Sequence, residues 1–185
     1  MPSRHRRSVR LRAHDYRGGL YFVTACTAGR RPLFGGVVSF EMALSAVGQI
    51  AHDEWVRTGE VRPDVVLDAF VVMPDHVHLL FGIAAPRATT VPPTGGRGVL
   101  QYAPTGEART FGSPSRTVGA VIRGYKGAVT RAVRARGRGT DAVWQRGSYD
   151  RVVRTDREAE AVRRYVRENP ARWHLRGDRR DGHRA

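Results

Sequence analysis

The fold is decided by residues 65–81, which read VVLDAFVVMPDHVHLLF. Residues 65–73 are apolar apart from Asp68, Pro74-Asp75 interrupts the run, and apolar residues resume around His76. Proline cannot donate a hydrogen bond to a β-ladder, and a Pro-Asp pair favours a turn. The pattern therefore predicts a hairpin of two strands joined by a tight turn.

Two histidines stand at alternate positions of the second predicted strand. Side chains two residues apart on a strand point to the same face, so His76 and His78 lie side by side while Val77 faces the other way. Two neutral imidazoles suit a divalent metal ion, and a third oxygen ligand would leave positions open for a phosphate. Two partly buried histidines bonded to the backbone or to Asp75 are the more common reason for this spacing when it stands alone.

The first third of the chain predicts a strand followed by a helix. Residues 20–27 are rich in aromatic and β-branched side chains between glycines, which is typical of a strand. Ser39 can cap a helix that ends near Gly59. The apolar positions of this helix recur at steps of three and four, at Met42, Leu44, Val47, Ile50, Ala51 and Trp55.

The last third predicts helix, strand and helix. Apolar residues between 118 and 133 form a stripe at helical spacing, and arginines lie beside it. A short strand follows around residues 151–154. Thr155 or Asp156 can cap a third helix that runs to Asn169, where Pro170 is expected to stop it.

The predicted order is strand, helix, strand, strand, helix, strand, then one more helix. This order is that of an α+β, ferredoxin-like antiparallel sheet with helices on one face, and it places His76 and His78 on an interior strand. We expect one domain over residues 16–174, after a basic N-terminal lead at 1–15. Residues 84–115, rich in Pro, Gly, Thr and Arg, predict a flexible insertion, and 175–185 predict a disordered basic tail.

The composition points to a polyanionic partner. The chain has 32 Lys and Arg against 17 Asp and Glu, a formal charge of +15, and nucleic acid heads the list of such partners. An arginine bias from GC-rich coding could produce the same excess. Cys26 is the single cysteine, which excludes an internal disulfide. Without a signal peptide or an apolar run of about 18 residues, we expect a cytoplasmic, nucleoid-associated protein and no membrane partner.

Four blocks of the sequence resemble one known family. Residues 72–80 resemble the His-hydrophobic-His motif of HUH nucleases, in the form found in single-tyrosine transposases of the insertion-sequence type. The blocks at 18–24, 144–154 and 165–173 match the REP-associated tyrosine transposases in the same order and at similar spacing. The resemblance thus covers roughly residues 16 to 174. The insertion at 84–115 is longer than this family leads one to expect.

The resemblance implies a function and a site. It implies a ferredoxin-like nuclease that uses Mg²⁺ or Mn²⁺ to cleave and rejoin single-stranded or hairpin DNA, such as repetitive palindromic elements, through a covalent 5′-phosphotyrosine. His76 and His78 would hold the metal, Asn169 would be the third ligand, and Tyr165 the nucleophile. Tyr165 and Asn169 are four residues apart, so they share one face of the predicted last helix.

Further residues and alternatives remain open at this point. Candidate DNA contacts on the two later helices are Arg123, Lys126, Arg131, Arg163 and Arg167. Tyr125 competes as nucleophile but lies on an apolar stripe, and Tyr149 is expected to pack near the site. There are three alternative functions: a catalytically inactive or domesticated single-stranded DNA-binding protein of the same fold, an RNA-binding ferredoxin-like domain, and a relaxase or replication initiator. The sequence is compatible with a monomer or a homodimer.

Overall fold

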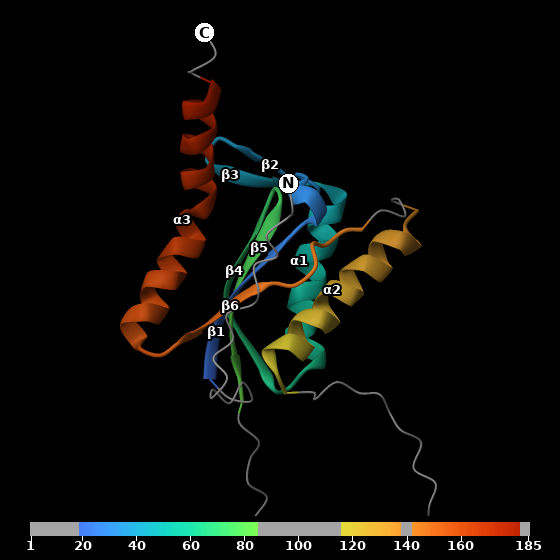
Figure 1. Ribbon diagram of the computed structural model, residues 1–185, viewed down its shortest axis with the longest axis vertical. Helices are drawn as coiled ribbons and strands as arrows, with labels where there is room; N and C mark the ends of the chain where they lie inside the picture. Colours follow the sequence, from blue (N-terminus) through green and yellow to red (C-terminus); the bar gives the residue numbers. More distant parts are fainter. Residues whose placement is uncertain (1–18, 85–115, 138–141, 182–185) are drawn as a thin grey trace, which may run out of the picture.

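The computed structural model describes residues 19–84, 116–137 and 142–181, and it contains the predicted α+β fold (Figure 1). A four-stranded antiparallel sheet has the order β4-β5-β1-β6. Its strands are β1 (Gly19–Cys26), β4 (Val65–Met73), β5 (His76–Ile83) and β6 (Tyr149–Val153). The basic lead at 1–15 and all of the insertion beyond Ala84 lie outside the described residues.

Three α-helices and a small second hairpin complete the described part. The helices are α1 (Ala46–Val61), α2 (Val118–Ala135) and α3 (Asp156–Asp181). A short 3-10 turn, η1 (Ala28–Arg30), precedes a hairpin of β2 (Gly35–Val38) and β3 (Glu41–Leu44). Within the described residues, none of the helices combines the length and the apolar character that crossing a membrane requires.

The predicted hairpin of residues 65–81 is confirmed, and its second strand is interior. β4 pairs with β5 across the turn at Pro74-Asp75, so that Met73 is the partner of His76. On its other side β5 pairs with β1, where His78 is the partner of Thr24 and His76 of Cys26. An interior strand is held by backbone hydrogen bonds to a neighbouring strand on each side, so the backbone at His76 and His78 is rigid.

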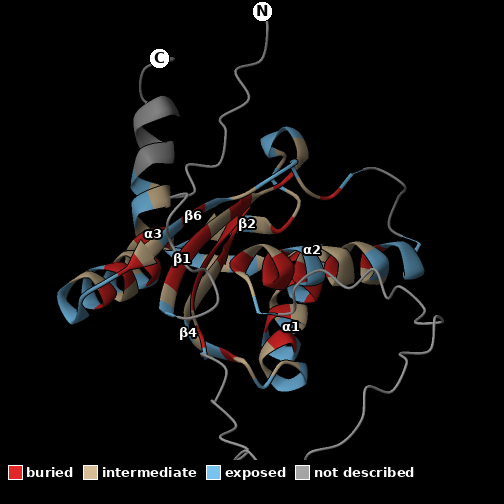
Figure 2. Cartoon of the chain, turned by 60° about the horizontal axis from the view of Figure 1, so that its bottom comes forward, coloured by how far each residue is buried: buried red, intermediate tan, exposed pale blue. Residues whose placement is uncertain are grey.

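The two faces of the sheet carry different helices, as Figures 1 and 2 show. Val77, Leu79 and Phe81 of β5 belong to the core shared with α1 and α2. Leu80 of β5 belongs to a smaller core that packs against α3. Because side chains alternate along a strand, His76 and His78 lie on the same face of β5 as Leu80, which is the face toward α3.

The predicted start of the first helix is wrong. Ser39 does not cap a helix: it lies with Phe40 in the turn of the β2–β3 hairpin, both with positive φ (48° and 68°), and Met42 and Leu44 lie on β3. The cap is Ser45, whose hydroxyl accepts a hydrogen bond from the Gly48 amide at 3.0 Å. Apolar residues at 42 and 44 fit the period of a strand as well as that of a helix, and pairing with β2 decided between them.

The predicted end of the last helix is also wrong. Pro170 lies inside α3, and the helix continues into the predicted tail as far as Asp181. Proline removes one helical hydrogen bond and costs roughly 3 kcal/mol in a helix interior, so tertiary contacts must offset it. Such contacts exist beyond the proline: the ring of Trp173 lies 5.8 Å from that of His76, and the ring of His174 lies 4.5 Å from that of Phe40.

Candidate active site and metal centre

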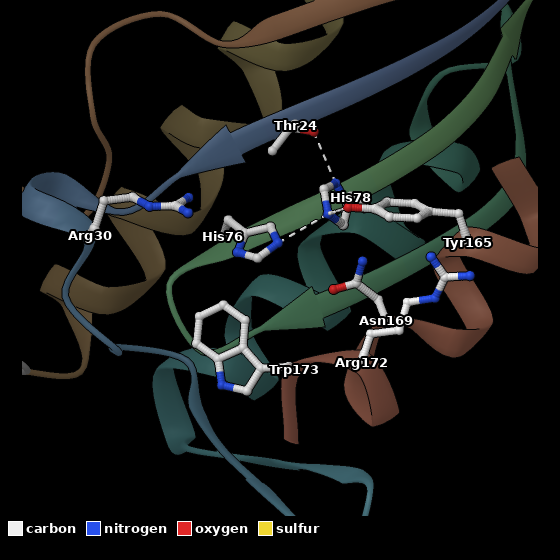
Figure 3. Close-up of a pocket in the computed structure, with 8 residues that line it drawn as sticks. All are labelled: Thr24, Arg30, His76, His78, Tyr165, Asn169, Arg172 and Trp173. Carbon is white, nitrogen blue, oxygen red and sulfur yellow. Dashed lines mark hydrogen bonds between the residues drawn. The ribbon is translucent and has the colours of Figure 1, made fainter. Parts of the chain in front are cut away.

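The two histidines converge on the α3 side of the sheet. His76 and His78 are 6% and 5% exposed, and their Nε2 atoms lie 3.0 Å apart (Figure 3). Phe22 of β1 stacks on the His78 ring at a centroid distance of 5.3 Å. The sheet thus presents two ring nitrogens to one point on the side where α3 packs.

The outer nitrogens of both rings are already hydrogen-bonded. His76 Nδ1 bonds to Asp75 Oδ1, and Asp75 Oδ2 accepts from Arg30 Nε at 3.1 Å. A carboxylate can only accept, so Nδ1 of His76 carries the proton and a neutral ring leaves a lone pair on Nε2. His78 Nδ1 lies 2.9 Å from the Thr24 hydroxyl, which can accept from it in the same way.

Burial keeps both imidazoles neutral. It lowers the pKa of His76 against the opposing effect of Asp75. Burial, followed by the neighbouring His76 and Arg30, lowers the pKa of His78 to about 3. Neutral imidazole is the form that binds a metal ion, and two unprotonated nitrogens that face each other this closely repel unless a cation or a proton lies near both.

Helix α3 brings the predicted nucleophile and the third ligand to the same place. Tyr165 Oη lies 3.2 Å from His78 Nε2, and the Tyr165 ring meets the rings of His78 and Phe22 edge-on at 5.1 and 6.0 Å. Asn169, one turn further along α3, is 7% exposed and lines the same cavity of about 180 Å³. The structure therefore brings all four predicted site residues together (Figure 3).

The donor set fits a divalent cation. His76 and His78 offer two ring nitrogens and Asn169 an amide oxygen, a mixed N/O set that suits borderline and hard divalent ions. Among the described residues, no group of three or more His, Cys, Asp or Glu side chains is arranged to hold a metal ion. The third ligand proposed for this site is an amide, and the cavity of about 180 Å³ beside it leaves room for substrate oxygens.

Four further residues line the cavity, and sequence reasoning assigned them no role there: Thr24, Arg30, Arg172 and Trp173. The guanidinium of Arg172 lies over the Tyr165 ring at 5.8 Å. Arg172 and Trp173 follow Tyr165 and Asn169 at helical spacing, seven and four residues on, which puts them on the same side of α3. Because the helix was predicted to end at Pro170, this helical spacing of Arg172 and Trp173 was not recognised. Arg30 comes from η1, and no spacing rule links it to the other residues.

Asp75 is predicted to set the metal affinity of the site, because it fixes the His76 ring through Nδ1. Asp75→Ala is expected to raise the Kd for Mn²⁺, measured by isothermal titration, about 10- to 100-fold, as is usual when a ligand histidine loses its carboxylate partner. Asp53→Ala removes the exposed Asp53–His52 pair and is the control, with no change expected. Equal Mn²⁺ affinity in the wild type and Asp75→Ala would contradict this role.

The predicted DNA-binding residues on α2 do not line this cavity. Arg123, Lys126 and Arg131 line a hollow of about 800 Å³ on the outer side of α2, which Arg134 and Arg146 also line. The described residues around that hollow include no Asp or Glu. Lys126 Nζ donates to the carbonyls of Gln145 and Gly147 at 2.7 and 2.8 Å, so it holds the loop before β6 against α2.

The two arginines predicted on α3 form ion pairs. Arg163 donates to both carboxylate oxygens of Asp68, at 2.8 and 2.7 Å. Arg167 Nη2 lies 3.5 Å from Glu160 on the same helix, and both side chains are largely exposed. An exposed pair of this kind is weak, so Arg167 remains available to a polyanion, whereas Arg163 connects α3 to the sheet.

Neither of the competing tyrosines lines the cavity. Tyr125 is 1% exposed, its hydroxyl donates to the Ala51 carbonyl at 2.9 Å, and burial raises its pKa, so the predicted core role is confirmed. Tyr149 of β6 is the register partner of Thr24, yet its side chain is 55% exposed. Neither hydroxyl is held beside the two histidines.

Known proteins that are similar to this chain include one found by sequence and one found by structure. An uncharacterised protein of Haemophilus influenzae is 30% identical to this chain, over 91% of this chain and 90% of that protein. The solved structure of a REP-associated tyrosine transposase bound to a REP hairpin has a TM-score of 0.57 and 16% identity, over 88% of this chain and 73% of that chain. No family model matches the chain. The resemblance predicted from the sequence blocks is thus confirmed at the level of the fold.

Proposed function

We propose that this chain, which belongs to the family of that Haemophilus influenzae protein and has the fold of the REP-associated tyrosine transposase, is a single-strand DNA endonuclease and transposase. Tyr165 would attack a phosphodiester and form a covalent 5′-phosphotyrosine, which a free 3′-hydroxyl can later reverse to rejoin the strand. The reaction would depend on Mg²⁺ or Mn²⁺ held by His76, His78 and Asn169.

One observation carries the proposal: the Tyr165 hydroxyl lies 3.2 Å from His78 Nε2, in the cavity that His76 and Asn169 also line. A tyrosine that only packs needs no contact between its hydroxyl and a ring nitrogen of a proposed metal ligand. Its hydroxyl lies beside His78 in the cavity, whereas the hydroxyl of Tyr125 is buried in the core. This is the arrangement that a nucleophile next to a bound phosphate requires.

The chemistry assigns a separate task to each group. As the Tyr165 oxygen forms its bond to phosphorus, the phenol proton is released, and the bond from phosphorus to the 3′-oxygen breaks. The leaving 3′-oxygen takes up a proton, so one strand end carries a 3′-hydroxyl and the other remains on Tyr165 as a 5′-phosphate ester. The ester conserves the bond energy, which makes rejoining possible without a nucleotide cofactor.

The charge that develops on the phosphate must be neutralised. A bound divalent ion supplies Lewis-acid stabilisation of the phosphate oxygens. Arg30 and Arg172 line the cavity from opposite elements, η1 and α3, and present two further positive charges. Arg172 also pairs with Glu168 at 2.6 Å, which holds its guanidinium over the Tyr165 ring.

The basic hollow on α2 supports DNA as the substrate. It lies on the sheet face opposite to His76 and His78, so DNA bound there would have to pass around the β6 edge to reach Tyr165. The loop that borders the hollow leads in that direction: the Gln145 amide donates to the Cys26 carbonyl at 2.8 Å, and Arg30 donates to Cys26 Sγ at 2.9 Å. By analogy with the transposase bound to a REP hairpin, hairpin DNA is the partner we propose.

The test is covalent capture. The protein is incubated with a labelled single strand taken from the DNA that flanks its own gene, with and without Mn²⁺ or Mg²⁺, and run on a denaturing gel. We expect an adduct on the single strand with metal ion, and none with EDTA or with the fully paired duplex. Binding without an adduct under every metal condition would instead support the inactive DNA-binding alternative.

A further inference from the structure

Helix α3 rests on the sheet through a narrow apolar contact. Ala159, Val162 and Val166 pack on Phe22, Leu80 and Val153. These side chains are small or branched, and they form one line along the helix. Such a contact fixes how far α3 lies from the sheet, but a line of Ala and Val side chains does not by itself define the rotation of the helix about its axis. The ring contacts of Tyr165 with His78 and of Trp173 with His76 depend on that rotation.

A β-bulge in the edge strand points an acidic residue at this helix. The register of β4 against β5 shifts between Leu67 and Ala69, which leaves Asp68 without a partner. Leu67 packs in the core with α1 and α2, whereas Ala69 packs in the core with α3. Strict alternation would have put Leu67 and Ala69 on one face. The bulge places Asp68 and Ala69 together on the α3 side, as bulges re-aim side chains near functional sites.

Arg163 meets Asp68 in a bidentate ion pair. Nε and Nη2 of Arg163 donate to Oδ1 and Oδ2 of Asp68 at 2.8 and 2.7 Å, and the side chains are 37% and 21% exposed. A single-point surface pair would add little, but a two-point pair between a planar guanidinium and a carboxylate also fixes relative orientation. The pair therefore joins the helix to the sheet edge in a defined rotation.

The pair and the nucleophile lie on opposite flanks of α3. An α-helix turns by about 100° per residue, so Arg163 and Tyr165 are separated by about 200° around the axis. Val162, Val166 and Asn169 fall between them, on the side that faces the sheet. A helix held on one flank at β4 keeps its other flank, with Tyr165, against His78. Rotation about the axis would carry the Tyr165 hydroxyl along an arc away from the cavity.

We propose that the Arg163–Asp68 pair is a positioning clamp, which fixes the rotation of α3 and so holds Tyr165 and Asn169 at the two histidines. The catalytic part of this inference rests on the proposed function. The sequence predicted Arg163 as a DNA contact, whereas this proposal gives it the role of binding Asp68 at the edge of the sheet. A misplacement of about 1 Å can cost a hundredfold in rate without loss of binding.

The experiment uses Asp68→Asn, Arg163→Gln and the double variant, labelled with 5-fluorotryptophan. The chain has three tryptophans: Trp173 on α3 beside His76, and Trp55 and Trp144, which pack in or against the core with α1 and α2. We expect the ¹⁹F resonance of Trp173 to shift or broaden in each single variant while those of Trp55 and Trp144 stay. The rate of adduct formation should fall about 10- to 100-fold, with unchanged affinity for the single strand.

Two comparisons make the result decisive. Glu160→Gln removes an exposed contact to Arg163 within the helix, at 3.5 Å, and should change neither the resonance nor the rate. The double variant should form the adduct no more slowly than either single variant, because each single substitution already removes the same Arg163–Asp68 interaction. If the ¹⁹F resonance of Trp173 is unchanged in both single variants, the Arg163–Asp68 pair does not fix the rotation of α3 and the proposal is wrong. If the wild type forms no adduct, the proposed function fails, and the Trp173 resonance still decides on the clamp.

Discussion

Replacing Tyr165 by phenylalanine is expected to abolish the covalent DNA adduct while leaving the fold intact. The variant deletes the hydroxyl that lies 3.2 Å from His78 Nε2 and keeps the ring that meets Phe22 and His78. The lost hydrogen bond is worth about 1 kcal/mol or less at a partly exposed site. Thermal unfolding should therefore change little, whereas the labelled band on a denaturing gel should disappear.

Two other tyrosines provide matched controls. Tyr125→Phe removes a buried hydrogen bond to the Ala51 carbonyl, so it should lower the free energy of unfolding by about 1 kcal/mol and still form the adduct. Tyr149→Phe changes an exposed side chain and should affect neither. The assignment of Tyr165 is wrong if its phenylalanine variant still forms an adduct and tryptic mass spectrometry finds the nucleotide on Tyr125 or Tyr149.

The second large effect is expected from the histidine pair. Replacing both His76 and His78 by alanine removes the two ring nitrogens that meet at 3.0 Å. Metal-assisted stabilisation of a phosphate is worth several kcal/mol, so cleavage should fall on the order of a thousandfold or more. Affinity for the single strand, measured by fluorescence anisotropy, should largely remain, because the arginines on α2 are untouched.

A surface histidine is the control for this pair. His52→Ala removes an imidazole from the exposed face of α1 and should leave metal-dependent cleavage unchanged. Wild-type cleavage by the double variant would exclude the two histidines as metal ligands. Loss of DNA affinity in parallel with cleavage would mean that the pair contributes to binding through the fold and not through a metal ion.

The pairing of residues 65–81 was predictable because its signals are local. The apolar runs, the Pro74-Asp75 turn and the alternation of His76, Val77 and His78 all act within one hairpin, and β4 and β5 follow them. The helix spacing of Tyr165 and Asn169 is local in the same sense. The strand and helix predictions rest on a repeat of 2 or 3.6 residues, which can be recognised from the order of the residues alone.

Two helix ends were not predictable for the opposite reason. Met42 and Leu44 fit a strand or a helix, and the choice fell to the pairing of β3 with β2. Pro170 favours a helix end on its own, and the contacts of Trp173 and His174 with His76 and Phe40 favour continuation. Local preference is worth a few kcal/mol at most, so packing of this kind can reverse it.

By itself the sequence determined the hairpin of residues 65–81 with its His76-Val77-His78 strand, because alternation and turn chemistry need no distant partner. The family resemblance placed Tyr165 and Asn169 at those histidines, and only the tertiary structure shows why these residues meet there. Arg30 of η1, Asp75 behind His76, and Tyr165 and Asn169 of α3 come together because β1 pairs with β5 and α3 packs on that face. The Asp68 bulge is of the same kind: a register shift between two strands has no signature in either strand alone.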